Sequence, residues 1–152
     1  MNTIAVLENS GEGFADAVCG ALADVPGVLA VNLAGAAGTS REISCDIVVV
    51  SPGYTGGARG SCLALLAPDG RAPTLFDSKT VVTYGMSPCS TLTLSSIGDG
   101  RAWLAVQREL MTLGGELVEE QELEITASGG TDASLAAAGG RLLLGITRAG
   151  LS

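Results

Sequence analysis

The sequence contains no histidine. This absence excludes Ser-His and Cys-His catalytic pairs and any imidazole general base. The four cysteines, Cys19, Cys45, Cys62 and Cys89, lie 26, 17 and 27 residues apart and form no C-x-x-C pair. Structural zinc sites usually take two ligands from one tight turn, so this spacing argues against a metal site. We expect reduced and mostly buried thiols, because free cysteine is among the most buried residue types.

Positive charge is scarce: Lys79 is the only lysine, seven arginines accompany it, and the formal net charge is −8. Such an acidic surface repels phosphate backbones and anionic lipids, which makes nucleic acid and membranes poor partners. No apolar run approaches 18 residues, and the stretch MNTIAVLENSGEGF has no basic residue before its apolar part. We therefore expect neither a signal peptide nor a transmembrane span, and the cytoplasm is the expected location.

Aromatic residues make up only 3% of the 152 residues, so the core must consist of alanine, valine, leucine and isoleucine. A chain of this length is most simply one domain. Its 22 glycines indicate many tight turns and close backbone contacts.

Residues 1–78 show the pattern of a mainly parallel sheet with a Rossmann-like start. Phe14, Ala17, Val18, Ala21 and Leu22 share one face of a predicted helix. The helix is predicted over Gly13–Asp24, strands over Thr3–Glu8, Val28–Ala34, Cys45–Ser51 and Cys62–Ala67, and loops over Ala37–Glu42 and Pro52–Ser61. The third of these strands is a continuous β-branched run, which is typical of a strand covered on both faces. The β-α-β-β order predicts an α/β fold.

Residues 79–152 predict antiparallel strands followed by a helix. Turn-forming sequences separate four strand candidates, Thr80–Gly85, Ser90–Ile97, Ala102–Leu110 and Glu116–Ile125. The last candidate is rich in glutamate, which favours a solvated sheet edge. Arg108 alternates with Val106 and Leu110, so we expect these three side chains on one face of a strand. The final helix is predicted over Thr131–Leu144, with Gly139 and Gly140 packed closely on the sheet.

One candidate ligand site is the turn NSGEGF after the first strand, with Ser10, Gly11 and Gly13 as binding residues. A Gly-x-Gly turn at a helix N-terminus presents free N–H groups to an anion. The third glycine of the dinucleotide pattern is missing, and Glu8 and Glu12 flank the turn, where a carboxylate would occupy or repel the anion position. The alternative is an ordinary strand-to-helix turn. No G-x-x-x-x-G-K-[ST] motif is present, which excludes a P-loop ATPase.

A second candidate is the loop after the third strand, in which Tyr54 and Arg59 offer a ring to stack on a ligand and a charge to hold an acid group. Ligands of open α/β sheets collect at the carboxyl ends of parallel strands. The alternative is a surface loop without chemistry. No G-x-S-x-G elbow accompanies any serine, so no catalytic residue is assigned.

The stretches VVTYGMSP, TLTLSSIGDG, LAVQREL and GGELVEEQELEI, and the helix that ends in LGI, resemble the end of the central domain of Mur ligases. These bacterial enzymes use ATP to add amino acids to peptidoglycan precursors. The resemblance covers about residues 80–146, and it implies that Gly85 and Pro88 shape a structural turn of that family. The family's His and Asn positions at the helix start fall on Gly129, Gly130 and Ala133, and the P-loop, the metal ligands and the C-terminal domain have no counterpart.

The sequence therefore predicts a single α/β domain and no ligase activity, cofactor or metal. The first functional hypothesis is a non-catalytic, Mur-ligase-like module that binds a partner protein or small ligand, linked to cell-wall precursor metabolism. The second is a small-ligand or nucleotide-binding domain that uses the two candidate loops. The third is a small enzyme that uses carboxylates or Mg²⁺. A homodimer is a further expectation, since exposed strand edges favour self-association.

Overall fold

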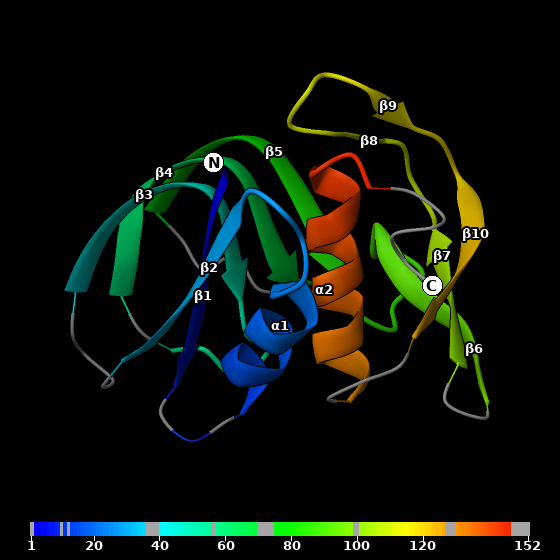
Figure 1. The fold of residues 1–152 in the computed structure, drawn as a ribbon, viewed down its shortest axis with the longest axis horizontal. Coiled ribbons are helices and arrows are strands. Elements are labelled where there is room, and N and C mark those ends of the chain that lie inside the picture. The colour runs from blue at the N-terminus through cyan, green and yellow to red at the C-terminus, as the bar shows by residue number, and fades with distance from the viewer. Residues whose placement is uncertain are drawn as a thin grey trace.

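The computed structural model describes residues 2–9, 11, 13–35, 40–55, 57–69, 75–98, 101–126 and 130–146 of the chain. It has the predicted α/β architecture, with a mostly parallel eight-stranded sheet and two helices within the described residues. A separate two-stranded hairpin accompanies the sheet (Figure 1).

The boundaries of the elements are as follows. The helices are α1 (Phe14–Leu22) and α2 (Thr131–Leu143). The strands of the main sheet are β1 (Asn2–Asn9), β2 (Val28–Gly35), β3 (Ser40–Val50), β4 (Gly57–Pro68), β5 (Leu75–Tyr84), β6 (Leu92–Gly98), β7 (Arg101–Val106) and β10 (Gln121–Thr126). The hairpin consists of β8 (Leu110–Met111) and β9 (Leu117–Val118).

The strand order across the main sheet is β10-β7-β6-β5-β4-β3-β1-β2. The pairs β2–β1, β1–β3, β3–β4, β4–β5 and β5–β6 are parallel, and the pairs β6–β7 and β7–β10 are antiparallel. Strand β10 is thus one edge of the sheet, as its glutamates predicted, and the Glu124 carboxylate lies 3.3 Å from the Arg101 guanidinium of β7. Strand β2 is the opposite edge.

Both helices lie on one face of the sheet, where they pack against each other (Figure 1). Gly139 allows α2 to lie close to the sheet. A Cβ atom there would lie 2.8 Å from Leu92 Cδ1 and 3.0 Å from Leu66 Cδ2. Gly140 faces α1 instead, and its Cβ would lie at an ordinary 3.5 Å from Leu22 Cδ1. The prediction of close glycine packing on the sheet is therefore confirmed for Gly139, whereas Gly140 packs on a helix.

The other face of the sheet is covered by the first parts of β3, β4 and β5, which bend over in mid-strand (Figure 1). The pairing registers pass over one residue in each strand at the bend, Asp46, Leu63 and Lys79. The prediction of a strand buried on both faces is confirmed, since Val48 and Val49 of β3 are fully buried in two different core clusters.

The loops predicted over Ala37–Glu42 and Pro52–Ser61 are wrong in part, because residues 40–42 belong to β3 and residues 57–61 to β4. Glycine is a turn signal in the sequence, but Gly60 lies within the paired strands β3 and β4. A Cβ atom at Gly60 would lie 1.7 Å from the Ile43 carbonyl oxygen, so the strands approach too closely for any other residue.

The predicted strand Ala102–Leu110 is also wrong at its end, because β7 stops at Val106 and Arg108 lies outside any strand. Gln107 follows β7, and its side-chain Nε2 donates hydrogen bonds to the carbonyl oxygens of Ser90 (2.7 Å) and Ser87 (3.3 Å). The Gln107 N–H still donates to the Thr91 carbonyl oxygen at 2.8 Å, and the side chain ties this point of the chain to the preceding turn. Neither α1 nor α2 is long and apolar enough to cross a membrane.

Candidate functional site

The two loops that the sequence suggested lie side by side at the carboxyl ends of β1 and β3. Asn9, the last residue of β1, joins them: its Nδ2 donates to the Gly53 carbonyl oxygen at 2.5 Å. Its Oδ1 accepts hydrogen bonds from the backbone N–H and the hydroxyl of Thr55, at 3.2 and 3.3 Å. Asn9 was not predicted from the sequence, although a polar residue at the carboxyl end of a buried parallel strand is itself a sign of a ligand site.

The candidate binding residues themselves divide between different surroundings. Gly11 and Gly13 are exposed in the turn after β1, and Ser10 lies outside the described residues. Tyr54 is half-buried and packs against the second core cluster. Arg59 is exposed within β4 rather than in a loop. The structure therefore brings the two loops together but places Arg59 on a strand.

The N-terminus of α1 is already occupied by a carboxylate. Glu8 is 4% exposed, and its Oε1 accepts a hydrogen bond from the Ala15 N–H at 2.5 Å. Gly13 is the N-cap residue and provides no side-chain cap. The expectation that a flanking carboxylate takes the anion position is thus confirmed for Glu8. A phosphate at this helix end would have to displace a buried, hydrogen-bonded charge.

A cavity of about 350 Å³ lies between the N-terminal ends of the two helices. Its lining residues are Gly13, Phe14, Pro52, Gly130, Thr131, Asp132 and Ala133. Gly130 is the N-cap of α2 and provides no side-chain cap, so the polar groups at the cavity are backbone N–H groups, the Thr131 hydroxyl and the Asp132 carboxylate. The sequence predicted only Gly13 of this set.

The turn after β5 is held by a buried tyrosine. The Tyr84 hydroxyl donates to the Val50 carbonyl oxygen at 2.6 Å, and its ring stacks on Phe14 with centroids 6.3 Å apart. Gly85 has a φ of 153°, which favours glycine, and Pro88 is exposed beyond it. Tyr84 thus joins the carboxyl end of β5 to the carboxyl end of β3.

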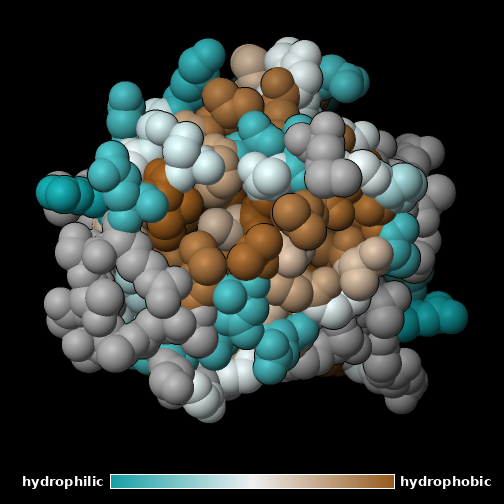
Figure 2. Space-filling view, turned by 60° about the vertical axis from the view of Figure 1, so that its left-hand side comes forward, coloured by the Kyte–Doolittle hydropathy of each residue, from teal (hydrophilic) through white to brown (hydrophobic). Residues whose placement is uncertain are grey.

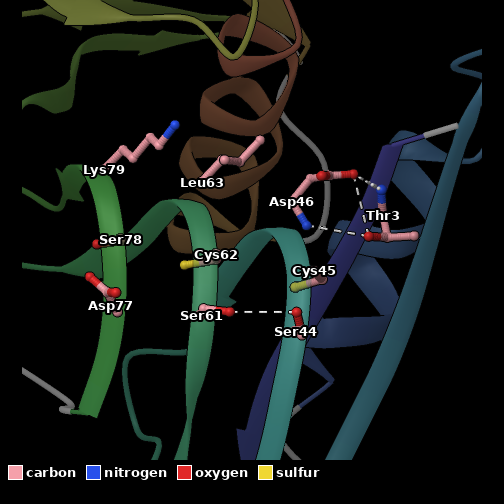
Figure 3. Close-up of a pocket in the computed structure, with 10 residues that line it drawn as sticks. All are labelled: Thr3, Ser44, Cys45, Asp46, Ser61, Cys62, Leu63, Asp77, Ser78 and Lys79. Carbon is pink, nitrogen blue, oxygen red and sulfur yellow. Dashed lines mark hydrogen bonds between the residues drawn. The ribbon is translucent and has the colours of Figure 1, made fainter.

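A second cavity, of about 540 Å³, lies where β3, β4 and β5 bend (Figure 3). Its lining residues are Thr3, Ser44, Cys45, Asp46, Ser61, Cys62, Leu63, Asp77, Ser78 and Lys79. The Ser44 and Ser61 hydroxyls are 3.5 Å apart, and Asp46 Oδ2 accepts a hydrogen bond from the Thr3 N–H at 2.8 Å (Figure 3). This cavity was not predicted from the sequence, because its lining residues come together only through the register of three bent strands.

Cys45 and Cys62 are free cysteines that lie opposite each other on the neighbouring strands β3 and β4, beside this cavity. Burial raises the pKa of the Cys62 thiol to about 11, and the neighbouring Cys45 adds to the effect. Burial likewise raises the pKa values of Cys45 and Cys19. These thiols are therefore protonated and weakly nucleophilic at neutral pH. The expectation of mostly buried thiols is wrong, because only Cys62 is buried, Cys19 and Cys45 are partly buried, and Cys89 is exposed.

An apolar row crosses the sheet on the face opposite the helices. It runs through paired residues of five neighbouring strands, Val31, Ala5, Val48, Leu65 and Val81. The three central members are buried, whereas Val31 is 40% and Val81 is 57% exposed. Leu29, next to Val31 on the same face of β2, is 49% exposed. The side of the molecule that carries β2, β3 and β4 shows a contiguous apolar area bordered by hydrophilic side chains (Figure 2).

In the part of the chain that the structure describes, no three Cys, Asp or Glu side chains are grouped so as to hold a metal ion. Comparisons of the chain with models of protein families, with curated proteins and with solved structures found no match.

Proposed function

We propose that this chain is a non-catalytic binding module whose partner is a protein, and that the partner docks on the apolar face opposite the helices. The observation that carries the proposal is the exposure of Leu29, Val31 and Val81 at the two ends of an apolar row whose middle residues are buried. An exposed apolar patch with a polar border is the usual mark of a protein-binding surface. A second copy of the chain is a further candidate partner.

The exposed apolar side chains supply part of the energy of a complex, and the partner's contacts with the polar border must supply the rest. Full burial of a Val or Leu side chain contributes about 1.5–3 kcal/mol, so covering a side chain that is half exposed contributes about 1 kcal/mol. Leu29, Val31 and Val81 together thus supply about 3 kcal/mol, which corresponds to roughly a hundredfold in affinity.

The resemblance of residues 80–146 to the end of the Mur ligase central domain supports a bacterial partner linked to cell-wall precursor metabolism. A cytoplasmic location is compatible with four free thiols. A non-catalytic role is supported by the helix that would carry the family's His and Asn residues: its N-cap is Gly130, and Ala133 is buried within it. Neither residue has a side chain that binds a nucleotide or a cation.

The proposal is tested by measuring the binding of the purified chain to each Mur ligase of its source bacterium by biolayer interferometry. We expect at least one complex, weakened tenfold or more by Val81→Asp. The matched control, Ser95→Asp, adds the same charge at an exposed position of β6 and should change the affinity less than twofold. Absence of any complex, or equal affinities for the two variants, would contradict the proposal.

The non-catalytic part is tested separately by thermal unfolding with ATP and Mg²⁺. A ligand at 100 times its Kd stabilises a protein by about 2.7 kcal/mol, which raises the melting temperature by several degrees. We expect no such rise. A clear rise would instead support a nucleotide-binding enzyme.

A small-ligand-binding domain is the second candidate function, and the joining of the two loops by Asn9 favours it. The ligand would sit in the cavity of about 350 Å³ beside these loops, at the low end of the size range of ligand pockets. Thermal unfolding with a panel of nucleotides and UDP-sugars distinguishes this function, because Asp132→Ala should abolish any stabilisation while Val81→Asp leaves it intact.

A further inference from the structure

The two edges of the main sheet differ in their protection against pairing with another chain. Natural edge strands usually carry charges, proline or bulges that prevent a further strand from adding to the sheet. Strand β10 has such protection, with Glu122 exposed and Glu124 in an ion pair. Strand β2 has the sequence VLAVNLAG, without charge or proline. It also pairs with β1 over all eight residues in one uninterrupted register, so it is regular along its whole length.

The side chains of β2 on the face opposite the helices are apolar and exposed. Val28 and Ala30 pack against the first core cluster under the helices. Leu29 and Val31 point to the other face, where they are 49% and 40% exposed. Leu33 follows on the same face and is half-buried against the second core cluster. The open backbone edge is thus bordered by an apolar stripe rather than by a solvated one.

We propose that β2 is a self-association edge, at which β2 of a second copy pairs in antiparallel orientation to form a two-fold symmetric dimer. This inference goes beyond the proposed function, since it uses the backbone edge of β2 with Leu29 and Val31 and does not involve Val81 on β5. A two-fold axis perpendicular to the sheet makes the paired strands antiparallel and the interface self-complementary. With the axis at Val31, the two copies of Val31 face each other and Leu29 lies opposite Leu33 of the second copy. The apolar faces of the two sheets then join into one surface.

The charge of the chain favours this edge over other surfaces. Each copy carries a formal net charge of −8, so two copies repel each other at long range. Contact is least unfavourable where neither copy presents a charge, and β2 is an edge strand of this kind. A carboxylate lies beside β2 on the helix side, where Asp16 of α1 accepts a hydrogen bond from the Asn32 side chain at 2.8 Å. Screening of these like charges by salt should therefore strengthen the dimer.

The size of the contact sets the expected affinity. An eight-residue strand is about 26 Å long, and a contact confined to its edge lies at the small end of specific interfaces. A dissociation constant in the micromolar range or weaker is therefore expected, and the dimer should appear only as the concentration rises.

Sedimentation velocity at 2–200 µM protein in 0.05 and 0.5 M NaCl tests the inference. We expect a monomer–dimer equilibrium for the unaltered chain, with a larger dimer fraction at the higher salt. Val31→Lys should abolish the dimer at all concentrations, because a lysine on an edge strand blocks pairing. Val81→Lys is the matched control: it places the same side chain at the other end of the same apolar row, away from the edge, and should leave the dimer intact. Leu29→Lys is the second edge variant in case Val31→Lys fails to fold.

Each other outcome overturns the inference. A chain that stays monomeric at 200 µM in both salts does not self-associate through β2. A dimer that survives both Val31→Lys and Leu29→Lys uses another interface, and one that is lost with Val81→Lys uses the sheet face instead of the edge. Hydrogen exchange gives a direct reading, since amides of Val28–Gly35 should become more protected with increasing concentration. A chain that fails to dimerise can still bind a different protein at Val81. Failure of this inference is therefore distinguishable from failure of the proposed function.

Discussion

Glu8 gives the sharpest test of how the candidate anion site at α1 is filled. Its carboxylate is buried and accepts a hydrogen bond from the Ala15 N–H. Removing an N-terminal capping group costs about 0.5–2 kcal/mol, and losing a negative charge at a helix N-terminus costs a further 0.3–1 kcal/mol or so. Glu8→Ala should therefore lower the free energy of unfolding by about 2 kcal/mol. Glu8→Gln keeps an acceptor oxygen and should lose about half as much.

Urea unfolding followed by circular dichroism measures these changes. With an m-value of about 2 kcal/mol/M, the loss in Glu8→Ala shifts the midpoint by about 1 M. The melting temperature should fall by about 4–8 °C. Glu42→Ala is the control, because Glu42 is exposed on β3 and its removal should change the stability by less than about 0.5 kcal/mol. The reasoning is refuted if Glu8→Ala is as stable as Glu42→Ala, or if Glu8→Gln is as destabilised as Glu8→Ala.

An anion provides a second reading of the same site. Glu8→Ala leaves the first-turn N–H groups of α1 without their carboxylate, so phosphate can bind there. Phosphate also stabilises proteins in general by exclusion from their surface, which the control variant corrects for. We expect 50 mM phosphate to raise the melting temperature of Glu8→Ala more than that of Glu42→Ala. An equal rise in both would show that the helix end has no affinity for anions.

Three further predictions concern packing and thiol chemistry. Gly140→Ala should stabilise the chain by up to about 1 kcal/mol through helix propensity. Gly139→Ala should destabilise it by about 1–3 kcal/mol, because the added methyl group overlaps two buried leucines. Equal melting temperatures of the two variants would contradict the packing. Ser90→Ala should be neutral or stabilising by about 1 kcal/mol, since the buried Ser90 hydroxyl has no hydrogen-bond partner among the described residues; a loss above 1 kcal/mol would reveal an unseen partner. At pH 8, iodoacetamide should modify Cys89 first and Cys62 last, because the raised pKa of about 11 leaves roughly 0.1% of Cys62 as thiolate. Mass spectrometry of timed digests measures the order of modification, and modification of Cys62 first would contradict its burial.

The raised pKa of Cys62 also predicts the direction of a pH effect on stability. The folded chain holds this proton more tightly than the unfolded chain, in which the thiol has its ordinary pKa of 9.0. The unfolded state therefore loses its proton first as the pH rises. Stability should be unaffected by this group below pH 9 and should fall between pH 9 and about 11.

The helices and the order of the elements follow from the sequence because their signals are local. The apolar face from Phe14 to Leu22 repeats with helical spacing, and α1 occupies those residues. The helix predicted over Thr131–Leu144 is observed over Thr131–Leu143. Each signal depends only on residues within a few positions, so neither the partner strand nor the register is needed to read it.

The extent of the strands does not follow from the sequence, because it depends on which strands are neighbours. Gly60 reads as a turn residue in isolation, but the carbonyl of Ile43 on the adjacent strand requires a glycine there. The cavity at the bends has the same origin. Ser44 and Ser61 are 17 residues apart in the chain, and only the register of β3 and β4 brings their hydroxyls within 3.5 Å. The meeting of the two candidate loops was foreseeable, because the carboxyl ends of parallel strands share one edge of the sheet.

The position of β2 separates the two proposed interactions in space. The residues on which the expected resemblance to Mur ligases is based begin in β5 and include β6, β7 and β10 at one side of the sheet. The proposed self-association edge is at the opposite end of the same sheet. Val81 of β5 lies at the start of the first region and is four strands away from β2 in the strand order. A dimer formed at β2 therefore leaves Val81 of both copies uncovered, and one dimer would offer two equivalent docking positions to a partner protein. If so, the affinity for a partner immobilised at high density should rise with dimerisation. Val31→Lys should remove this gain, and it should also weaken the binding of a single copy, because Val31 belongs to the proposed docking face.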